Sequence, residues 1–133
     1  GIVKDEVKKI LERHNVWYFM TTTMGFGKSG VPDFVCCFDG KFISIETKFD
    51  AAKHRQNYSV KKGSPTPRQI EEMTEIRKHG GVTLLVDKDN LTVLDAYFRA
   101  LTVGKDPNYS DSLWINFHQK ACEQPLIYTN EVE

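Results

Sequence analysis

Two carboxylates placed to face each other are the most chemically suggestive feature of this sequence. Residues 31–38 and 41–49 have the character of strands, and the Asp39-Gly40 dipeptide between them is a strong signal for a two-residue hairpin turn. Counting outward from that turn sets Asp33 directly opposite Glu46, a position in which Cβ atoms lie about 4.5 to 5.5 Å apart on one face of a sheet. The sequence therefore predicts a pair of opposed carboxylates.

Such a pair is unfavourable unless something binds it. At ~5 Å the repulsion is about 3 kcal/mol for an effective dielectric near 20, and a purely structural strand gains nothing from it. A divalent cation reverses the sign, because Mg²⁺ accepts one or two carboxylates in its octahedral shell and leaves positions for water and a phosphate oxygen. We therefore interpret Asp33 and Glu46 as a metal site.

A lysine completes this group. Lys48 lies two residues after Glu46 and projects from the same face of the strand. An ammonium beside a cation site can orient an attacking water or offset charge on a pentacoordinate phosphorus. Together the three side chains provide what hydrolysis of a phosphodiester needs.

A fourth acidic residue comes from the expected first helix. Glu6 borders the apolar stripe of Val3, Val7 and Ile10 on a helical wheel, so it is able to reach inward to the metal. The alternative is that Glu6 is a surface residue flanking the stripe.

The remaining elements indicate an α/β domain with a mixed sheet. We expect a helix at 3–14, an extended segment at 17–23, a glycine loop at 24–30 and a polar loop at 50–65. Thr66-Pro67-Arg68-Gln69 carries a capping box and opens a helix to about His79, followed by a strand at 82–86. A turn at 87–90, a short strand at Leu91–Leu94 and a helix from Asp95 through Leu101 complete the readable part.

Two motifs resemble a known family. Gly30-Val31-Pro32-Asp33 and Ile45-Glu46-Thr47-Lys48 resemble the motif of the PD-(D/E)XK nuclease superfamily, which carries Pro-Asp and Glu-X-Lys on adjoining strands. Within it, the chain looks like a stand-alone, virus-type VRR-NUC domain, where a downstream helix opens with Pro-x-Gln, here Pro67-Arg68-Gln69. The resemblance covers roughly residues 3–86.

The resemblance implies a restriction-endonuclease-like αβββαβ core, with a mixed central sheet flanked by helices. It implies that Asp33, Glu46 and the Thr47 carbonyl bind Mg²⁺, for which Mn²⁺ substitutes, and that Glu6 completes the metal shell. It also implies that Lys48 orients the attacking water and that Gln69 supports catalysis from its helix. Gln69 has a second explanation as the capping partner of Thr66.

Charge is unevenly distributed in a chain whose formal net charge is zero. The segment from Lys48 to Arg68 is basic, and the segment from Lys105 to the end is acidic. The non-specific affinity of a protein for nucleic acid depends on how many phosphates its lysines and arginines neutralise. The loop at 24–30 is expected to lie beside Asp33. The nucleic-acid contacts that we predict are Lys28, Ser29, Lys53, Arg55, Lys61, Lys62 and Arg68.

Composition bounds the other possibilities. A length of 133 residues favours a single domain spanning 1–133, and no apolar run approaches the length of a membrane span. The three cysteines fit reduced thiols, and no secretory leader is evident, so we expect a cytoplasmic protein, in the host cell if viral. Gly25-x-Gly27-x-x-Gly30 precedes a strand instead of opening a helix, so no nucleotide cofactor is expected.

The resulting hypothesis is a metal-dependent endonuclease acting on DNA, specific for branched structures such as four-way junctions. Because one chain carries one site, symmetrical cutting of a junction requires a homodimer. The alternative is a non-catalytic nucleic-acid-binding module that retains the nuclease fold.

Overall fold

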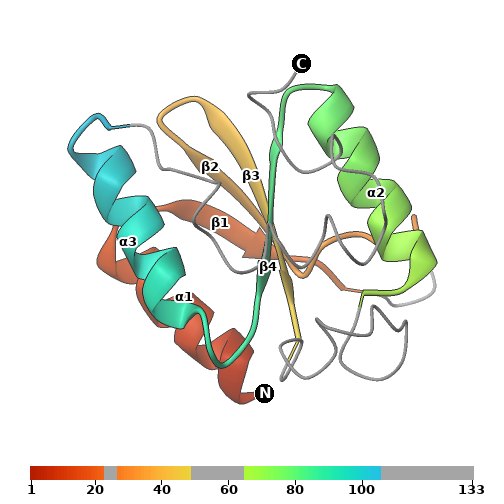
Figure 1. The fold of residues 1–133 in the computed structure, drawn as a ribbon, viewed down its shortest axis with the longest axis horizontal. Coiled ribbons are helices and arrows are strands. Elements are labelled where there is room, and N and C mark those ends of the chain that lie inside the picture. The colour runs from red at the N-terminus through yellow and green to blue at the C-terminus, as the bar shows by residue number, and fades with distance from the viewer. Residues whose placement is uncertain (23–26, 49–64, 106–133) are drawn as a thin grey trace.

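The computed structural model describes residues 1–22, 27–48 and 65–105. These residues form an α/β fold of three helices and a four-stranded mixed sheet in the order αβββαβα, which confirms the predicted class (Figure 1). The elements are α1 (Ile2–Arg13), β1 (Trp17–Met20), β2 (Phe34–Phe38), β3 (Lys41–Thr47), α2 (Pro67–Lys78), β4 (Val82–Val86) and α3 (Leu91–Thr102).

The β2–β3 hairpin has the predicted register. Phe38 pairs with Lys41 across the turn, and the ladder runs outward to the pair Phe34 and Ile45. Asp39 and Gly40 both have positive φ, 51° and 79°, as the tight primed hairpin turns require, and aspartate and glycine adopt this conformation most readily. The local chemistry of the turn therefore sets the alignment of the whole hairpin.

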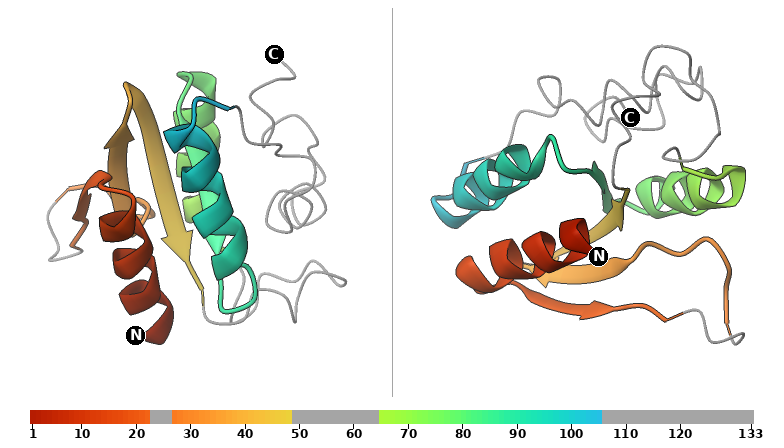
Figure 2. Two further views of the ribbon diagram at one scale, coloured as in Figure 1. Left: turned by 90° about the vertical axis from the view of Figure 1, so that its left-hand side faces the viewer. Right: turned by 90° about the horizontal axis from the view of Figure 1, so that it is seen from below.

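The sheet order is β1-β2-β3-β4. β1–β2 and β2–β3 are antiparallel, whereas β3 and β4 are parallel, so the chain must cross over between them, and α2 lies on this connection. Figures 1 and 2 show α1 and α3 side by side on one side of the sheet and α2 on the other.

The main hydrophobic core lies between the sheet and the α1–α3 pair. Alternate residues of each hairpin strand point into this core, and the cross-strand partners Phe34 and Ile45 are fully buried there. The Phe98 ring of α3 packs edge-on against both Phe38 and Tyr97. The opposite set of β3 side chains, which includes Glu46, faces α2. The pleat of one strand thus separates core from site.

The start of α2 matches the sequence prediction. Thr66 Oγ1 accepts a hydrogen bond from the Gln69 amide at 3.1 Å, and Gln69 Oε1 accepts one from the Thr66 amide at 2.9 Å. Pro67 occupies the first turn, where its missing N–H costs nothing.

The predicted short strand at Leu91–Leu94 is wrong, because these residues form the first turn of α3. The buried positions Leu94, Tyr97, Phe98 and Leu101 have helical spacing, so packing against the core overrides the β-like character of a four-residue apolar run. Asn90, not Asp95, precedes the helix. Its side-chain Nδ2 donates a hydrogen bond to the Leu85 carbonyl, and its Oδ1 accepts one from the Asp87 backbone amide.

Asp95 instead ties α3 to the end of α1. Its carboxylate accepts hydrogen bonds at 2.8 Å from Arg13 and His14 and pairs with Arg99. The hydrogen bond with His14 is the main cause that lowers the pKa of Asp95. This carboxylate therefore serves the packing of the two helices.

The strands are shorter than expected, since β1 ends at Met20, β2 begins at Phe34 and β3 ends at Thr47. Each described helix has twelve residues, and in the described ranges none is long and apolar enough to cross a membrane. The predicted loop at 50–65, apart from Pro65, and nearly all of the acidic C-terminal segment lie outside the described residues.

Candidate active site

Glu46 is a buried acid at the end of the hairpin away from the turn. It is 3% exposed. Because β3 is hydrogen-bonded to β2 on one side and to β4 on the other, the backbone at Glu46 cannot easily shift to bring the side chain to solvent. Its Oε2 accepts a hydrogen bond of 2.6 Å from the Gln69 side chain, whereas Oε1 is buried and has no hydrogen-bond partner among the described residues. A buried carboxylate oxygen without a partner is costly, and a bound ion or water would satisfy it.

The protonation of Glu46 reflects this environment. Burial, and secondarily the negative charge of Asp33, raise the pKa of its carboxyl to about 8. The positive charges of Lys48 and Lys4 and the backbone of Asp33 act in the opposite direction. Anything that adds positive charge beside Glu46 will therefore favour the ionised form.

Asp33 comes immediately before β2 and is the next residue beyond the Phe34–Ile45 pair, which sets it opposite Glu46. Its Oδ2 accepts hydrogen bonds from the Thr47 amide at 2.9 Å and the Thr47 hydroxyl at 2.7 Å. Its backbone carbonyl accepts one from the Thr21 amide. The carboxylate is thus fixed through Oδ2, whereas Oδ1 lies 3.8 Å from the Lys4 ammonium.

Two lysines flank the carboxylates. Lys48 Nζ lies 3.7 Å from Glu46 Oε2, and Lys4 Nζ, from the first turn of α1, lies 3.8 Å from Asp33 Oδ1. Both distances exceed the hydrogen-bond range, so these ammonium groups are held by charge attraction and their N–H donors are not committed to the carboxylates. Lys4 was not among the residues predicted from the sequence.

Gln69 both caps α2 and contacts the buried acid, and its role in catalysis stays a prediction. Its Oε1 caps α2 while its Nε2 donates to Glu46, so the same side chain connects the helix start to the buried acid. The capping box thereby fixes which way the amide points, with the N–H₂ group toward the carboxylate.

The segment before Asp33 is packed tightly against α2. Gly30 has a φ of +75°, and a Cβ placed on it would lie 2.6 Å from Arg68 Cγ and 2.8 Å from the Arg68 carbonyl oxygen. Only glycine satisfies both conditions. The glycine of the Gly30-Val31-Pro32-Asp33 motif therefore allows a close approach that helps to position Asp33.

Arg68 and Lys28 converge on a buried carboxylate. Glu72 is 6% exposed and receives Arg68 Nη2 at 2.7 Å and Lys28 Nζ at 3.1 Å. Arg68 also bonds Glu71 and the Ser29 hydroxyl. In this arrangement Arg68 acts as a clamp between the loop and α2, and a role for Arg68, Lys28 or Ser29 in binding nucleic acid stays a prediction.

The structure does not bring every predicted residue to the pair. The Glu6 carboxylate bonds Lys9 at 3.0 Å on the surface of α1, and within the described ranges no group of three or more His, Cys, Asp and Glu side chains is placed to hold a metal. The acidic ligands that the described site offers are therefore Asp33 and Glu46, and coordination by the Thr47 carbonyl stays a prediction. Lys53, Arg55, Lys61 and Lys62 lie outside the described residues.

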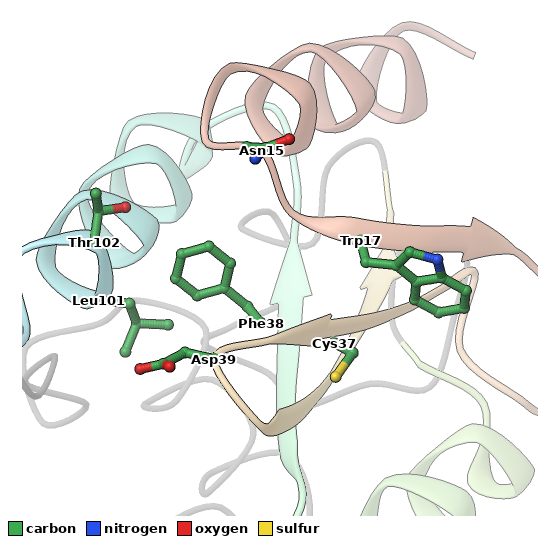
Figure 3. A pocket seen from close by; sticks show the side chains of 7 residues that line it. All are labelled: Asn15, Trp17, Cys37, Phe38, Asp39, Leu101 and Thr102. Carbon is green, nitrogen blue, oxygen red and sulfur yellow. The ribbon is translucent and has the colours of Figure 1, made fainter.

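A separate open hollow of about 470 Å³ lies at the turn end of the hairpin, remote from the carboxylate pair. It is bounded by Asn15, Trp17, Cys37, Phe38, Asp39, Leu101 and Thr102 (Figure 3). Asp39 is the one acidic residue in this lining, which provides no paired groups for catalysis. The chemistry that the described residues support is therefore at the Asp33–Glu46 end.

Comparison of the chain with models of known protein families gives no match, and comparison with curated proteins gives none either.

Proposed function

We propose that this protein is a metal-dependent endonuclease that hydrolyses phosphodiester bonds in DNA, with Asp33, Glu46 and Lys48 as its active centre. The observation that carries the proposal is the opposed pair of carboxylates, one of them with a buried and unsatisfied oxygen, beside a lysine. The restriction-endonuclease-like description of the core and the membership of the nuclease superfamily are part of the same proposal.

The residues fit a divalent cation. Glu46 Oε1 lacks a hydrogen-bond partner in the described structure, and Asp33 Oδ1 lies 3.8 Å from the Lys4 ammonium, beyond hydrogen-bond distance. Hard oxygen ligands from two carboxylates, together with a backbone carbonyl from Thr47, suit Mg²⁺ or Mn²⁺, which commonly bind through one or two carboxylates. When bound, such an ion supplies Lewis-acid activation of water and neutralises charge on the phosphate.

The side chains divide the remaining work. Gln69 holds Glu46 through Oε2, and Thr47 holds Asp33 through Oδ2, so each acid presents its other oxygen to the site. Fixed acids of this kind reduce the reorganisation needed at the moment of reaction.

Lys48 is 3.7 Å from Glu46, with its side chain 19% exposed, and is placed to orient the attacking water and offset negative charge on the phosphate oxygens. In hydrolysis the water hydroxyl joins phosphorus, the bond from phosphorus to the leaving sugar oxygen breaks, and that oxygen takes the proton. Positioned acid–base and electrostatic groups contribute about 10²- to 10⁴-fold each.

We further propose that the substrate is a branched DNA such as a four-way junction, cut by a homodimer in the cytoplasm. The support is the resemblance of the motifs and the requirement for two sites in symmetrical cutting.

The test is cleavage of labelled four-way junctions, flaps, duplexes and single strands in Mg²⁺. We expect Lys48→Ala to lower the single-turnover rate by about 100-fold or more while binding persists. Lys41→Ala is the matched control, because Lys41 is an exposed lysine on the same strand at the turn end.

If every substrate stays intact with the wild type, the nuclease proposal fails. The alternative, a non-catalytic binding module, would then be examined by calorimetric titration with Mn²⁺. A module predicts no Mn²⁺ binding, or binding that Asp33→Asn leaves unchanged.

A further inference from the structure

A small cavity adjoins the carboxylate pair on the side of α1. Its volume is about 150 Å³, and it is lined by the first turn of α1, from Gly1 to Lys4, and by Thr47 and Lys48 at the end of β3. The two lysines of the site therefore line one cavity, although they lie more than forty positions apart in the sequence.

Each lysine that lines this cavity is paired with one acid of the site. Lys4 faces Asp33 and Lys48 faces Glu46, so two ammonium groups stand against two carboxyl groups. Because neither ion pair is within hydrogen-bond distance, the ammonium donors are able to turn to another acceptor without breaking a hydrogen bond to these acids. Lys4 is also 42% exposed along its side chain and so is reachable from solvent.

A divalent cation bound by the two acids would change the charge beside the cavity. The carboxylates would then be neutralised by that cation, and the two ammonium groups would leave a local excess of positive charge beside the cavity. A phosphate group carries the charge and the acceptor oxygens that suit two converging ammonium groups.

We infer that the cavity between Lys4 and Lys48 is a subsite for a backbone phosphate of the nucleic-acid strand, adjacent to the phosphate that is cleaved, and that Lys4 is its binding residue. The inference rests on the proposed function for the identity of the strand. It assigns to the first turn of α1 a direct contact with substrate. Lys48, which lines the cavity and flanks Glu46, connects the subsite to the reacting phosphate.

The experiment measures binding without cleavage. Fluorescence anisotropy of a labelled four-way DNA junction is recorded over a range of salt concentrations for wild type, Lys4→Ala, Lys4→Arg and Lys9→Ala. A fixed concentration of Ca²⁺ replaces Mg²⁺, so that a divalent cation is present at the two acids, and the junction is verified to be intact after each titration. Lys9→Ala is the matched control, since Lys9 lies on the same helix and its exposed ammonium pairs with Glu6 outside the site.

Loss of one phosphate contact to duplex DNA makes the slope of log K against log salt less steep by about 0.9. We expect that change for Lys4→Ala, an unchanged slope for Lys9→Ala, and a slope close to wild type for Lys4→Arg, which keeps the charge. Urea unfolding of each variant establishes that the folded protein is being compared.

An unchanged slope in Lys4→Ala, an equal change in Lys9→Ala, or no binding by the wild type would overturn the subsite. A second arm titrates inorganic phosphate alone by calorimetry. Binding of free phosphate that depends on Lys4, with no change in the slope for DNA, would make the cavity a site for the free ion and would also overturn the strand contact.

The outcomes separate this inference from the proposed function. A wild type that cleaves DNA while Lys4→Ala keeps the wild-type slope retains the nuclease and loses the subsite. A wild type that binds with a Lys4-dependent slope but never cleaves in Mg²⁺ retains the subsite and loses the nuclease.

Discussion

Replacement of Glu46 by glutamine tests how the buried acid behaves when no cation is bound. The pKa of Glu46 rises from 4.5 to about 8 on folding, so between these values the folded protein holds a proton that the unfolded chain releases. The unfolded state therefore gains in relative stability as pH rises through this window, and the contribution levels off above the folded pKa. Glu46 makes the protein less stable at higher pH.

The magnitude follows from the size of the shift. One pKa unit corresponds to about 1.4 kcal/mol. Glu46 alone therefore lowers the free energy of unfolding by roughly 2 to 3 kcal/mol between about pH 5.5 and about pH 7.5. Because the side chain is buried, solvent screening reduces this value little. Glu46→Gln keeps the shape and cannot ionise, so it should lack this part of the pH dependence.

The assay is urea unfolding in EDTA at both pH values, followed by circular dichroism, for wild type, Glu46→Gln and the control Glu75→Gln. Glu75 is an exposed acid on α2 that pairs with Lys78. Adding Mg²⁺ at the higher pH should restore stability to the wild type and not to Glu46→Gln, because a ligand of the folded state stabilises it. Equal pH dependence in wild type and Glu46→Gln would refute the reasoning.

Three further substitutions test the supporting contacts. Thr47→Val removes the hydroxyl that holds Asp33, and calorimetry should show Mn²⁺ binding weakened by about 10-fold, with unchanged affinity as the opposing result. Gly30→Ala places a Cβ against Arg68 at positive φ and should destabilise the protein by about 2 kcal/mol in urea; a neutral effect would mean that the close approach is not required. Asp95→Asn weakens the link between α1 and α3 and should cost about 1 to 3 kcal/mol at neutral pH, whereas wild-type stability would contradict this role.

The hairpin could be predicted because its information is local. A two-residue turn and a side-chain period of two determine which residues oppose each other, and no distant contact is needed to place Asp33 beside Glu46. The capping box of α2 is equally local, which is why the start of that helix was predicted correctly.

Other parts depend on packing that a sequence pattern does not specify. Leu91–Leu94 is too short an apolar run to distinguish a strand from a buried helical turn, and the α3 core contacts decide it. On α1, Glu6 and Lys4 border opposite sides of the same buried stripe. Lys4 lies on the same face of the helix as the fully buried Leu11, seven residues later. The sequence shows this spacing, but it does not show which edge of the apolar stripe faces the site.

Glu72 makes a contact with Lys28 that also depends on packing that the sequence does not specify. Its carboxylate receives one cation from its own helix, Arg68, and one from Lys28, which lies 44 positions away in the sequence. Only the second contact depends on how α2 docks against the loop. Sequence reasoning assigned both cations to nucleic acid, because it could not show that they converge on a buried acid.

The most direct test of the central claim is single-turnover cleavage of a labelled four-way junction in Mg²⁺ by wild type, Asp33→Asn and Glu46→Gln, with Glu75→Gln as the control. The account predicts cleavage by wild type and control and a loss of about 100-fold or more in both site variants, since each removes a carboxylate from the pair. Cleavage by either site variant at the wild-type rate would contradict it.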